Sequence, residues 1–150
     1  MSETLDFNPL HLAARYSHLD VVKYLIEKGS NIEYKSKFGE KPLHFAVHPG
    51  KLSVLQYLIG KGTDINARGP YGQSPLHEAA QLSKRQSGLK IVKYLVEKGA
   101  DFNVKDDSGS TPLHKAASKG ELDTVKFLIE KGADLNVKDS YGSIPLQKLL

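Results

Sequence analysis

The chain of 150 residues has no cysteine, no tryptophan and a single methionine. Without cysteine it can form no disulfide, and it has neither a thiolate metal ligand nor a thiol nucleophile. No apolar run approaches the ~18–20 residues that span a bilayer, and the first residues lack the basic and apolar stretches of a signal peptide. We therefore expect no membrane association, and the lack of cysteine suits a reducing compartment such as the cytoplasm.

The excess of positive charge is small. Lysine and arginine number 21 against 17 aspartate and glutamate residues, which gives a net charge of +4. Because this excess is spread along the chain, nucleic-acid binding is not expected. The sequence also lacks a Gly-x-Ser-x-Gly motif, a phosphate-binding glycine-rich loop and a His-Glu-x-x-His motif. We expect no enzymatic activity, no cofactor and no small-molecule substrate.

The chain contains five copies of one seven-residue motif, at residues 8–14, 41–47, 74–80, 111–117 and 144–150. The prolines of these copies stand at positions 9, 42, 75, 112 and 145, so the steps are 33, 33, 37 and 33 residues. A period of this length and regularity indicates a stack of one structural unit.

The fourth copy shows how the unit folds. Thr111 is a suitable N-cap and Pro112 suits the first helical turn, where a missing N–H costs nothing. A second helix is expected over residues 122–131. Its buried face is expected to carry Leu122, Val125, Leu128 and Ile129. A glycine in the left-handed conformation ends this helix in each full copy, and these glycines are Gly29, Gly62, Gly99 and Gly132.

The sequence Gly-Ser-Thr-Pro-Leu-His-Lys-Ala-Ala at residues 109–117, followed by Val-Lys-Phe-Leu-Ile-Glu-Lys-Gly-Ala-Asp-Leu-Asn at 125–136, resembles the ankyrin repeat. The resemblance covers nearly the whole chain and implies an all-α repeat solenoid. Antiparallel helix pairs would stack in a right-handed superhelix, with β-hairpin or turn segments projecting as fingers. Residues 1–150 would form a single domain. Its repeats are expected at residues 3–35 (an N-terminal cap), 36–68, 69–105, 106–138 and 139–150 (a truncated half repeat).

Two regions depart from this pattern. The third repeat has four extra residues, nominally 83–86, between its helices. They are interpreted either as a tolerated insertion in a surface loop or as a specific contact or modification site, since Ser87 follows Lys84 and Arg85 closely. The fifth repeat stops before any second helix. It is either a short C-terminal cap or the point at which a longer protein has been cut.

Four of the six histidines occupy one repeat position: His11, His44, His77 and His114. A zinc site needs clustered ligands in tetrahedral geometry, and no second ligand type recurs beside these histidines. The resemblance implies instead that each histidine forms a hydrogen bond to the backbone near the turn and ties neighbouring repeats together. We expect a structural role for them and no metal site.

The expected fingers carry aromatic and basic side chains. Phe38, Tyr71 and Tyr141 share a fingertip position, where they either anchor a partner or brace adjacent fingers. One basic residue recurs per finger, and these residues are Lys35, Arg68, Lys105 and Lys138. They serve either solubility or the attraction of an acidic partner.

The resemblance implies a monomeric, non-catalytic scaffold that binds another protein on the concave face formed by the fingers and the inner helices. By position in the repeat, the expected contact residues are Phe38, Glu40, His48, Arg68, Tyr71, Gln73, Gln81, Leu82, Lys105, Ser108, Ser110 and Lys119. The alternative is that the repeats are the targeting or regulatory region of a larger protein, such as an effector, toxin, channel or enzyme.

Overall fold

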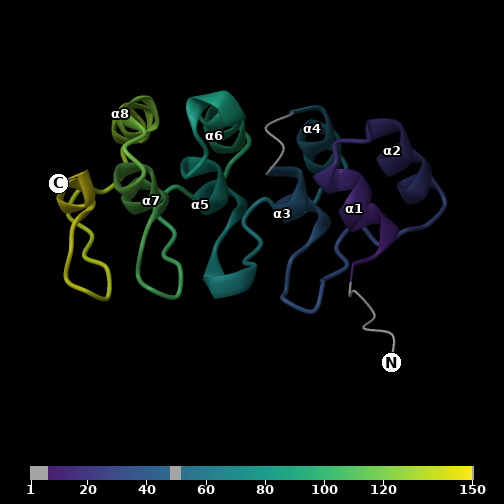
Figure 1. Cartoon of the computed structure of the whole chain (residues 1–150), viewed down its shortest axis with the longest axis horizontal. Helices are drawn as coiled ribbons and strands as arrows, with labels where there is room; N and C mark the ends of the chain where they lie inside the picture. Colours follow the sequence, from purple (N-terminus) through teal and green to yellow (C-terminus); the bar gives the residue numbers. More distant parts are fainter. Residues whose placement is uncertain (1–6, 48–51, 150) are drawn as a thin grey trace.

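The computed structural model describes residues 7–47 and 52–149, and within them the chain is an all-helical stack of repeated helix pairs (Figure 1). The inner row consists of α1 (Pro9–Arg15), α3 (Pro42–Val47), α5 (Pro75–Ala80) and α7 (Pro112–Ser118). The outer row consists of α2 (Leu19–Glu27), α4 (Leu52–Gly60), α6 (Gly88–Glu97) and α8 (Leu122–Glu130). Three short 3₁₀ helices are η1 (Pro70–Gly72), η2 (Lys84–Gln86) and η3 (Pro145–Leu149). No helix in this part of the chain is long and apolar enough to cross a membrane.

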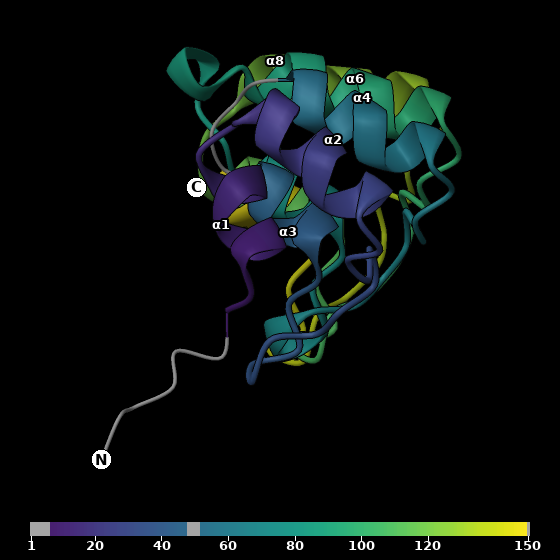
Figure 2. The same ribbon diagram turned by 90° about the vertical axis from the view of Figure 1, so that its right-hand side faces the viewer.

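Viewed along the stack, the molecule has three levels: outer helices, inner helices, and a row of loops that project from the inner helices (Figure 2). We call these loops fingers and number them by repeat: residues 36–40, 69–73, 106–110 and 139–143 form the second to fifth fingers. The surface that the fingers and the inner helices share is called the finger face.

Three of the inner helices begin at a cap residue whose side chain satisfies a backbone N–H. In α7 the Thr111 side chain accepts a hydrogen bond from the His114 N–H, and the His114 ring accepts one from the Thr111 N–H. Asn8 and Ser74 form the same reciprocal arrangement with the histidines of α1 and α5. Proline follows each of these caps, where its fixed φ favours the helix and its missing N–H costs no hydrogen bond.

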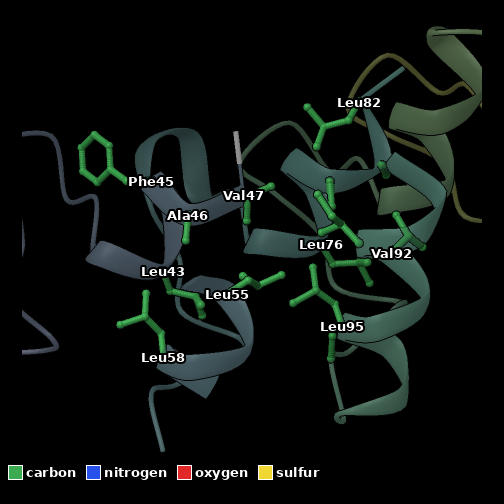
Figure 3. Close-up of a cluster of buried hydrophobic side chains, with 14 of the residues drawn as sticks. Leu43, Phe45, Ala46, Val47, Leu55, Leu58, Leu76, Leu82, Val92 and Leu95 are labelled. Atoms are coloured by element: carbon green, nitrogen blue, oxygen red, sulfur yellow. The ribbon is translucent and has the colours of Figure 1, made fainter. Parts of the chain in front are cut away.

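Leucine and alanine build one continuous core between the two rows of helices. Leu43, Leu76, Leu55 and Leu95 are almost fully buried, and Figure 3 shows them meeting between the inner and outer helices of the second and third repeats. The buried face of α8 differs from the expectation, because Leu122 is 54% exposed while Thr124 is buried. Leu122 is the first residue of α8, and no further outer helix follows α8 in the described part of the chain.

The fingers are closed turns, and no residue in the described ranges forms a β-strand. Of the two forms expected for the fingers, β-hairpin or turn, the structure has the turn. In the fourth finger the Asp106 N–H donates to the Ser110 carbonyl (2.8 Å) and the Gly109 N–H donates to the Asp106 carbonyl (3.0 Å). A finger of five residues closed in this way is too short to build a ladder of paired strands.

The four extra residues of the third repeat form an ordered 3₁₀ turn. The side chain of Gln86 accepts hydrogen bonds from the N–H and hydroxyl of Ser83, which closes the turn on itself. Lys84 and Arg85 are exposed. The turn directs the chain into α6 through Ser87, whose φ of 58° matches that of Ser17 at the same place in the first repeat (57°).

Candidate functional site

The histidine that recurs in four of the repeats links each inner helix to the following repeat. Nε2 of each ring lies 2.8–2.9 Å from a backbone carbonyl oxygen of that repeat. The four pairs are His11 with Tyr34, His44 with Ala67, His77 with Ser110 and His114 with Ser143. The other ring nitrogen, Nδ1, accepts a hydrogen bond from the backbone N–H of the cap residue. Since a carbonyl cannot donate, the proton belongs on Nε2 and each ring is neutral in this arrangement.

We call these four rings and their hydrogen bonds the histidine ladder. The hydrogen bonds of this ladder require neutral rings. Burial lowers the pKa of His44 and His77 below the ordinary value of 6.5, and it outweighs the hydrogen bonds to Ala67 and Ser110, which raise the pKa. Protonation would place a second hydrogen on Nδ1, where it would face the N–H of the cap. Within residues 7–47 and 52–149 no group of three or more His, Asp or Glu side chains is placed to hold a metal ion.

We expect His77→Gln to reduce the acid sensitivity of the fold. In the fifth repeat Gln147 stands at the histidine position, and its Oε1 accepts from the Ile144 N–H (2.8 Å), so glutamine can replace the Nδ1 acceptor. At pH 7 the variant loses the Nε2 bond to Ser110, which should cost about 1–2 kcal/mol. Because the folded pKa of His77 is lowered, wild-type stability falls as pH drops through 6.5, so the difference between the two proteins should shrink towards pH 5.

The measurement is urea unfolding at several pH values between 5 and 7.5. His18→Gln is the control, because His18 is exposed and caps no backbone group with its side chain. A difference for His77→Gln that stays constant across this pH range would contradict the neutral-ring ladder.

Three aromatic side chains stand out from the tips of the fingers. Phe38 is 64% exposed, Tyr71 is 79% exposed and Tyr141 is 83% exposed. Tyr71 also has a φ of 59°, in the left-handed region that side chains other than glycine rarely adopt. Rings exposed to this degree bury little surface against neighbouring fingers, which favours contact with a partner over a bracing role.

Matching ion pairs brace the fourth and fifth fingers, each to the helix that follows it in the chain. Lys115 on α7 pairs with Asp106 (3.2 Å), and Lys148 in η3 pairs with Asp139 (2.9 Å). Burial raises the pKa of Asp106, but hydrogen bonds from the Ser110 and Ser108 N–H groups and the pairing with Lys115 outweigh it. The pKa of Asp106 is therefore lowered, and its carboxylate is held in the charged form.

Adjacent fingers are also joined by backbone hydrogen bonds. The Asp107 N–H donates to the Tyr71 carbonyl (3.0 Å), which joins the third and fourth fingers. The Ser140 N–H donates to the Ser108 carbonyl (2.9 Å), which joins the fourth and fifth. This half of the finger row is therefore held in a fixed geometry, as a preformed binding surface requires.

An open pocket of about 320 Å³ lies on the finger face between the second and third fingers. Its lining combines acidic, amide, aromatic and apolar side chains: Glu40, Pro70, Tyr71, Gln73, Glu78, Gln81 and Leu82. A second hollow, of about 360 Å³, lies at the start of α6 beside the extra turn, and its lining includes three lysines, Lys84, Lys90 and Lys93.

A family model for ankyrin repeats, in three copies, matches residues 2–69 and 50–139. The chain belongs to the ankyrin repeat family. No curated protein matched the sequence. Ankyrin repeats are in general protein–protein interaction modules, and the family is typically non-catalytic. The histidine ladder and the fingers described above are thus parts of an ankyrin scaffold.

Most of the expected contact residues lie on the fingers, directly before them, or at the ends of the inner helices. The exposed or half-buried ones are Phe38, Glu40, Arg68, Tyr71, Gln73, Gln81, Lys105, Ser108 and Lys119. Two are buried instead. Leu82 is 6% exposed and contributes to the wall of the pocket. Ser110 is 8% exposed; its carbonyl accepts a hydrogen bond from His77 and its N–H donates one to Asp106. His48 lies outside the described residues.

Reasoning from the sequence overlooked four residues of this ankyrin surface. Leu12 and Tyr16 are exposed on and just after α1, by 44% and 63%. Pro70 and Glu78 line the pocket. Glu78 had a signal in the sequence: its repeat position reads Leu12, Phe45, Glu78, Lys115 and Lys148, and it is the only acidic residue among the five.

Proposed function

We propose that this ankyrin domain binds a partner protein across the finger face, with the exposed fingertip rings as anchors. The observation that carries the proposal is the exposure of Phe38, Tyr71 and Tyr141 on the second, third and fifth fingers. Aromatic side chains on a rigid support provide large contact areas at low entropic cost, and they are enriched among the residues that dominate binding energy.

The basic residues of the fingers support a role in orienting the partner. Lys35, Arg68, Lys105 and Lys138 are all exposed, one on or beside each finger. Exposed charges of one sign contribute little to affinity but raise the association rate with a surface of opposite sign. We propose that they steer an acidic region of the partner towards the finger face.

We expect the double variant Phe38→Ala/Tyr71→Ala to bind its partner about 30- to 1,000-fold more weakly, since two anchor residues typically contribute about 1–2 kcal/mol each. The free energy of unfolding should change by less than about 0.5 kcal/mol, because both rings are mostly exposed. The partner would be identified as the protein captured by the wild-type chain and lost by the variant, and its dissociation constant would be measured with purified components.

Tyr24→Ala provides the matched control. Tyr24 lies on the outer helix α2, away from the fingers, and is 60% exposed, so this change removes an aromatic surface of similar size. Retention of the partner by Tyr24→Ala and its loss by the double variant would support the proposal. Equal capture by all three proteins would exclude the fingertips, and an equal loss of stability and binding in the double variant would identify the rings as structural braces.

A further inference from the structure

The hollow beside the extra turn of the third repeat has only cations among its ionisable side chains. Its volume is about 360 Å³, and its lining consists of Lys84, Ser87, Gly88, Leu89, Lys90 and Lys93. None of these three lysines forms an ion pair within residues 7–47 and 52–149. Three ammonium groups around one concave surface raise its positive potential, which attracts anions. We call this surface the basic hollow.

Two of the lysines stand where the third repeat differs from the others. Lys84 belongs to the four extra residues and has no counterpart in the other repeats. Lys90 takes a position that is acidic or polar in the other full repeats, where it is held by Asp20, Ser53 and Asp123. The positive charge of the basic hollow is therefore particular to the third repeat and is not required by the repeated scaffold.

The extra turn is closed by its own hydrogen bonds, so the edge of the basic hollow has a defined shape. The Gln86 N–H donates to the Ser83 carbonyl (3.0 Å), and the Ser87 N–H donates to the Lys84 carbonyl (3.1 Å). In Figure 2 this teal turn projects beyond the row of outer helices, where a partner can reach it. The Ser87 side chain forms no capping hydrogen bond to α6, so its hydroxyl is available as a donor to a ligand.

The basic hollow continues into a groove between α6 and α8. A neighbouring hollow of about 180 Å³ shares Leu89 and Lys93 with it, and its lining adds Asp123, Lys126, Phe127 and Glu130. The Lys93 ammonium lies 5.8 Å from the centre of the Phe127 ring, which joins the two parts. We call the two hollows together the outer groove. Its first part is purely cationic, and its second part combines both signs of charge with apolar surface.

We propose that the outer groove binds an acidic segment of a partner protein, with Asp or Glu side chains in the basic hollow and an apolar side chain against Leu89 and Phe127. The charge pattern selects this occupant. Carboxylates suit the cationic first part, whereas Asp123 and Glu130 in the second part disfavour a nucleic acid, which carries a negative charge at every phosphate. Because the groove lies on the outer helices, this proposal is independent of binding at the finger face.

The test is an NMR titration of the whole chain with the peptide acetyl-Glu-Glu-Glu-Leu-amide, with acetyl-Gln-Gln-Gln-Leu-amide as a neutral peptide of similar shape. We expect the acidic peptide to cause saturable shifts at the amides that surround the outer groove, with a dissociation constant on the order of 0.1–1 mM at low salt. Affinity should fall at least about fivefold as the salt concentration rises from about 20 mM to about 200 mM, because exposed charges supply the attraction. The neutral peptide should cause no saturable shifts.

Lys84→Gln/Lys90→Gln should weaken binding of the acidic peptide about 4- to 9-fold, since each exposed charge contributes about a factor of two to three. Both side chains are exposed, so the variant should fold like the wild type. Lys28→Gln/Lys61→Gln is the matched control. It removes two exposed lysines at the ends of α2 and α4, outside the outer groove, and should leave the affinity unchanged.

Equal binding of the two peptides, or an equal loss of affinity in the two double lysine variants, would overturn the proposal. Tighter binding of inorganic phosphate or of a short oligothymidine than of the acidic peptide would also overturn it, because the groove would then select phosphate. Phe38→Ala/Tyr71→Ala should bind the acidic peptide as the wild type does. Loss of the peptide in that variant would place the acidic segment on the fingers and would contradict a separate outer site.

Discussion

Glu78→Gln is expected to raise the free energy of unfolding by about 2–4 kcal/mol at pH 8. Glutamine has nearly the same shape as glutamate but carries no charge, so it removes the cost of ionising a shielded carboxyl beside Glu40. Most stabilising surface changes contribute far less than this. The size of the effect follows from the distance between the pKa of Glu78 in the folded chain, about 8, and its ordinary value of 4.5.

The effect has a defined pH window. Between pH 4.5 and pH 8 the folded chain keeps a proton on Glu78 that the unfolded chain has released. The folded state therefore binds more protons in this range, and wild-type stability falls as the pH rises through it. The difference between variant and wild type should be small near pH 4.5, grow steadily, and level off above pH 8.

Urea unfolding at intervals between pH 4.5 and pH 9 measures this difference, and Glu97→Gln on the exposed surface of α6 is the matched control. A difference that does not change with pH would mean that the carboxyl of Glu78 is solvated in the folded state.

The histidine ladder changes the free energy of unfolding with pH in the opposite direction, at the acid end of the range. Burial lowers the pKa of His44 and His77, so stability is lost as pH falls below 6.5, while Glu78 causes a loss as pH rises above 4.5. The two trends oppose each other between these values, and above 6.5 only the contribution of Glu78 continues. Glu78→Gln should therefore shift the pH of maximum stability upwards.

The arrangement of helices could be predicted because local signals in each repeat agree. Thr111 caps, Pro112 starts the inner helix and Gly132, with a φ of 101°, ends the outer one. The same signals recur at a fixed period, so one unit defines the others. The exposure of Leu122 could not be predicted from periodicity, because it depends on which helices pack beside α8 in the folded stack.

The candidate site could be predicted only in outline. The fingertip positions of Phe38 and Tyr71 follow from the repeat register, whereas the burial of Leu82 and Ser110 depends on contacts between repeats. The pocket was missed because no single residue in it forms a motif. It arises from residues of separate segments, among them Glu40, Pro70 and Glu78, that come together only in the folded stack. Residues that maintain the repeat preserve the scaffold, and residues that break it are candidates for function.

Gly88→Ala is expected to lower the free energy of unfolding by about 2–3 kcal/mol. Within a helix this exchange normally stabilises, by up to about 1 kcal/mol. Gly88, however, is the buried first residue of α6, and a Cβ there would collide with the backbone carbonyl oxygen of Leu82, which lies two residues after the end of α5. A backbone atom cannot move aside as a flexible side chain can, so α5 and α6 must separate.

Gly60→Ala is the matched control, because Gly60 is the last residue of α4, its φ lies outside the left-handed region, and a Cβ there would have no atom within 4 Å. It should be neutral or slightly stabilising in the same urea unfolding measurement.

Deleting residues 83–86 tests whether the extra turn causes the need for glycine at position 88. The deletion restores the step of 33 residues and places Gly88 at the position of His18 and Glu121, which carry full side chains. Gly88→Ala in that shortened chain should then be harmless. An undiminished loss would mean that packing between α5 and α6, and not the extra turn, requires glycine.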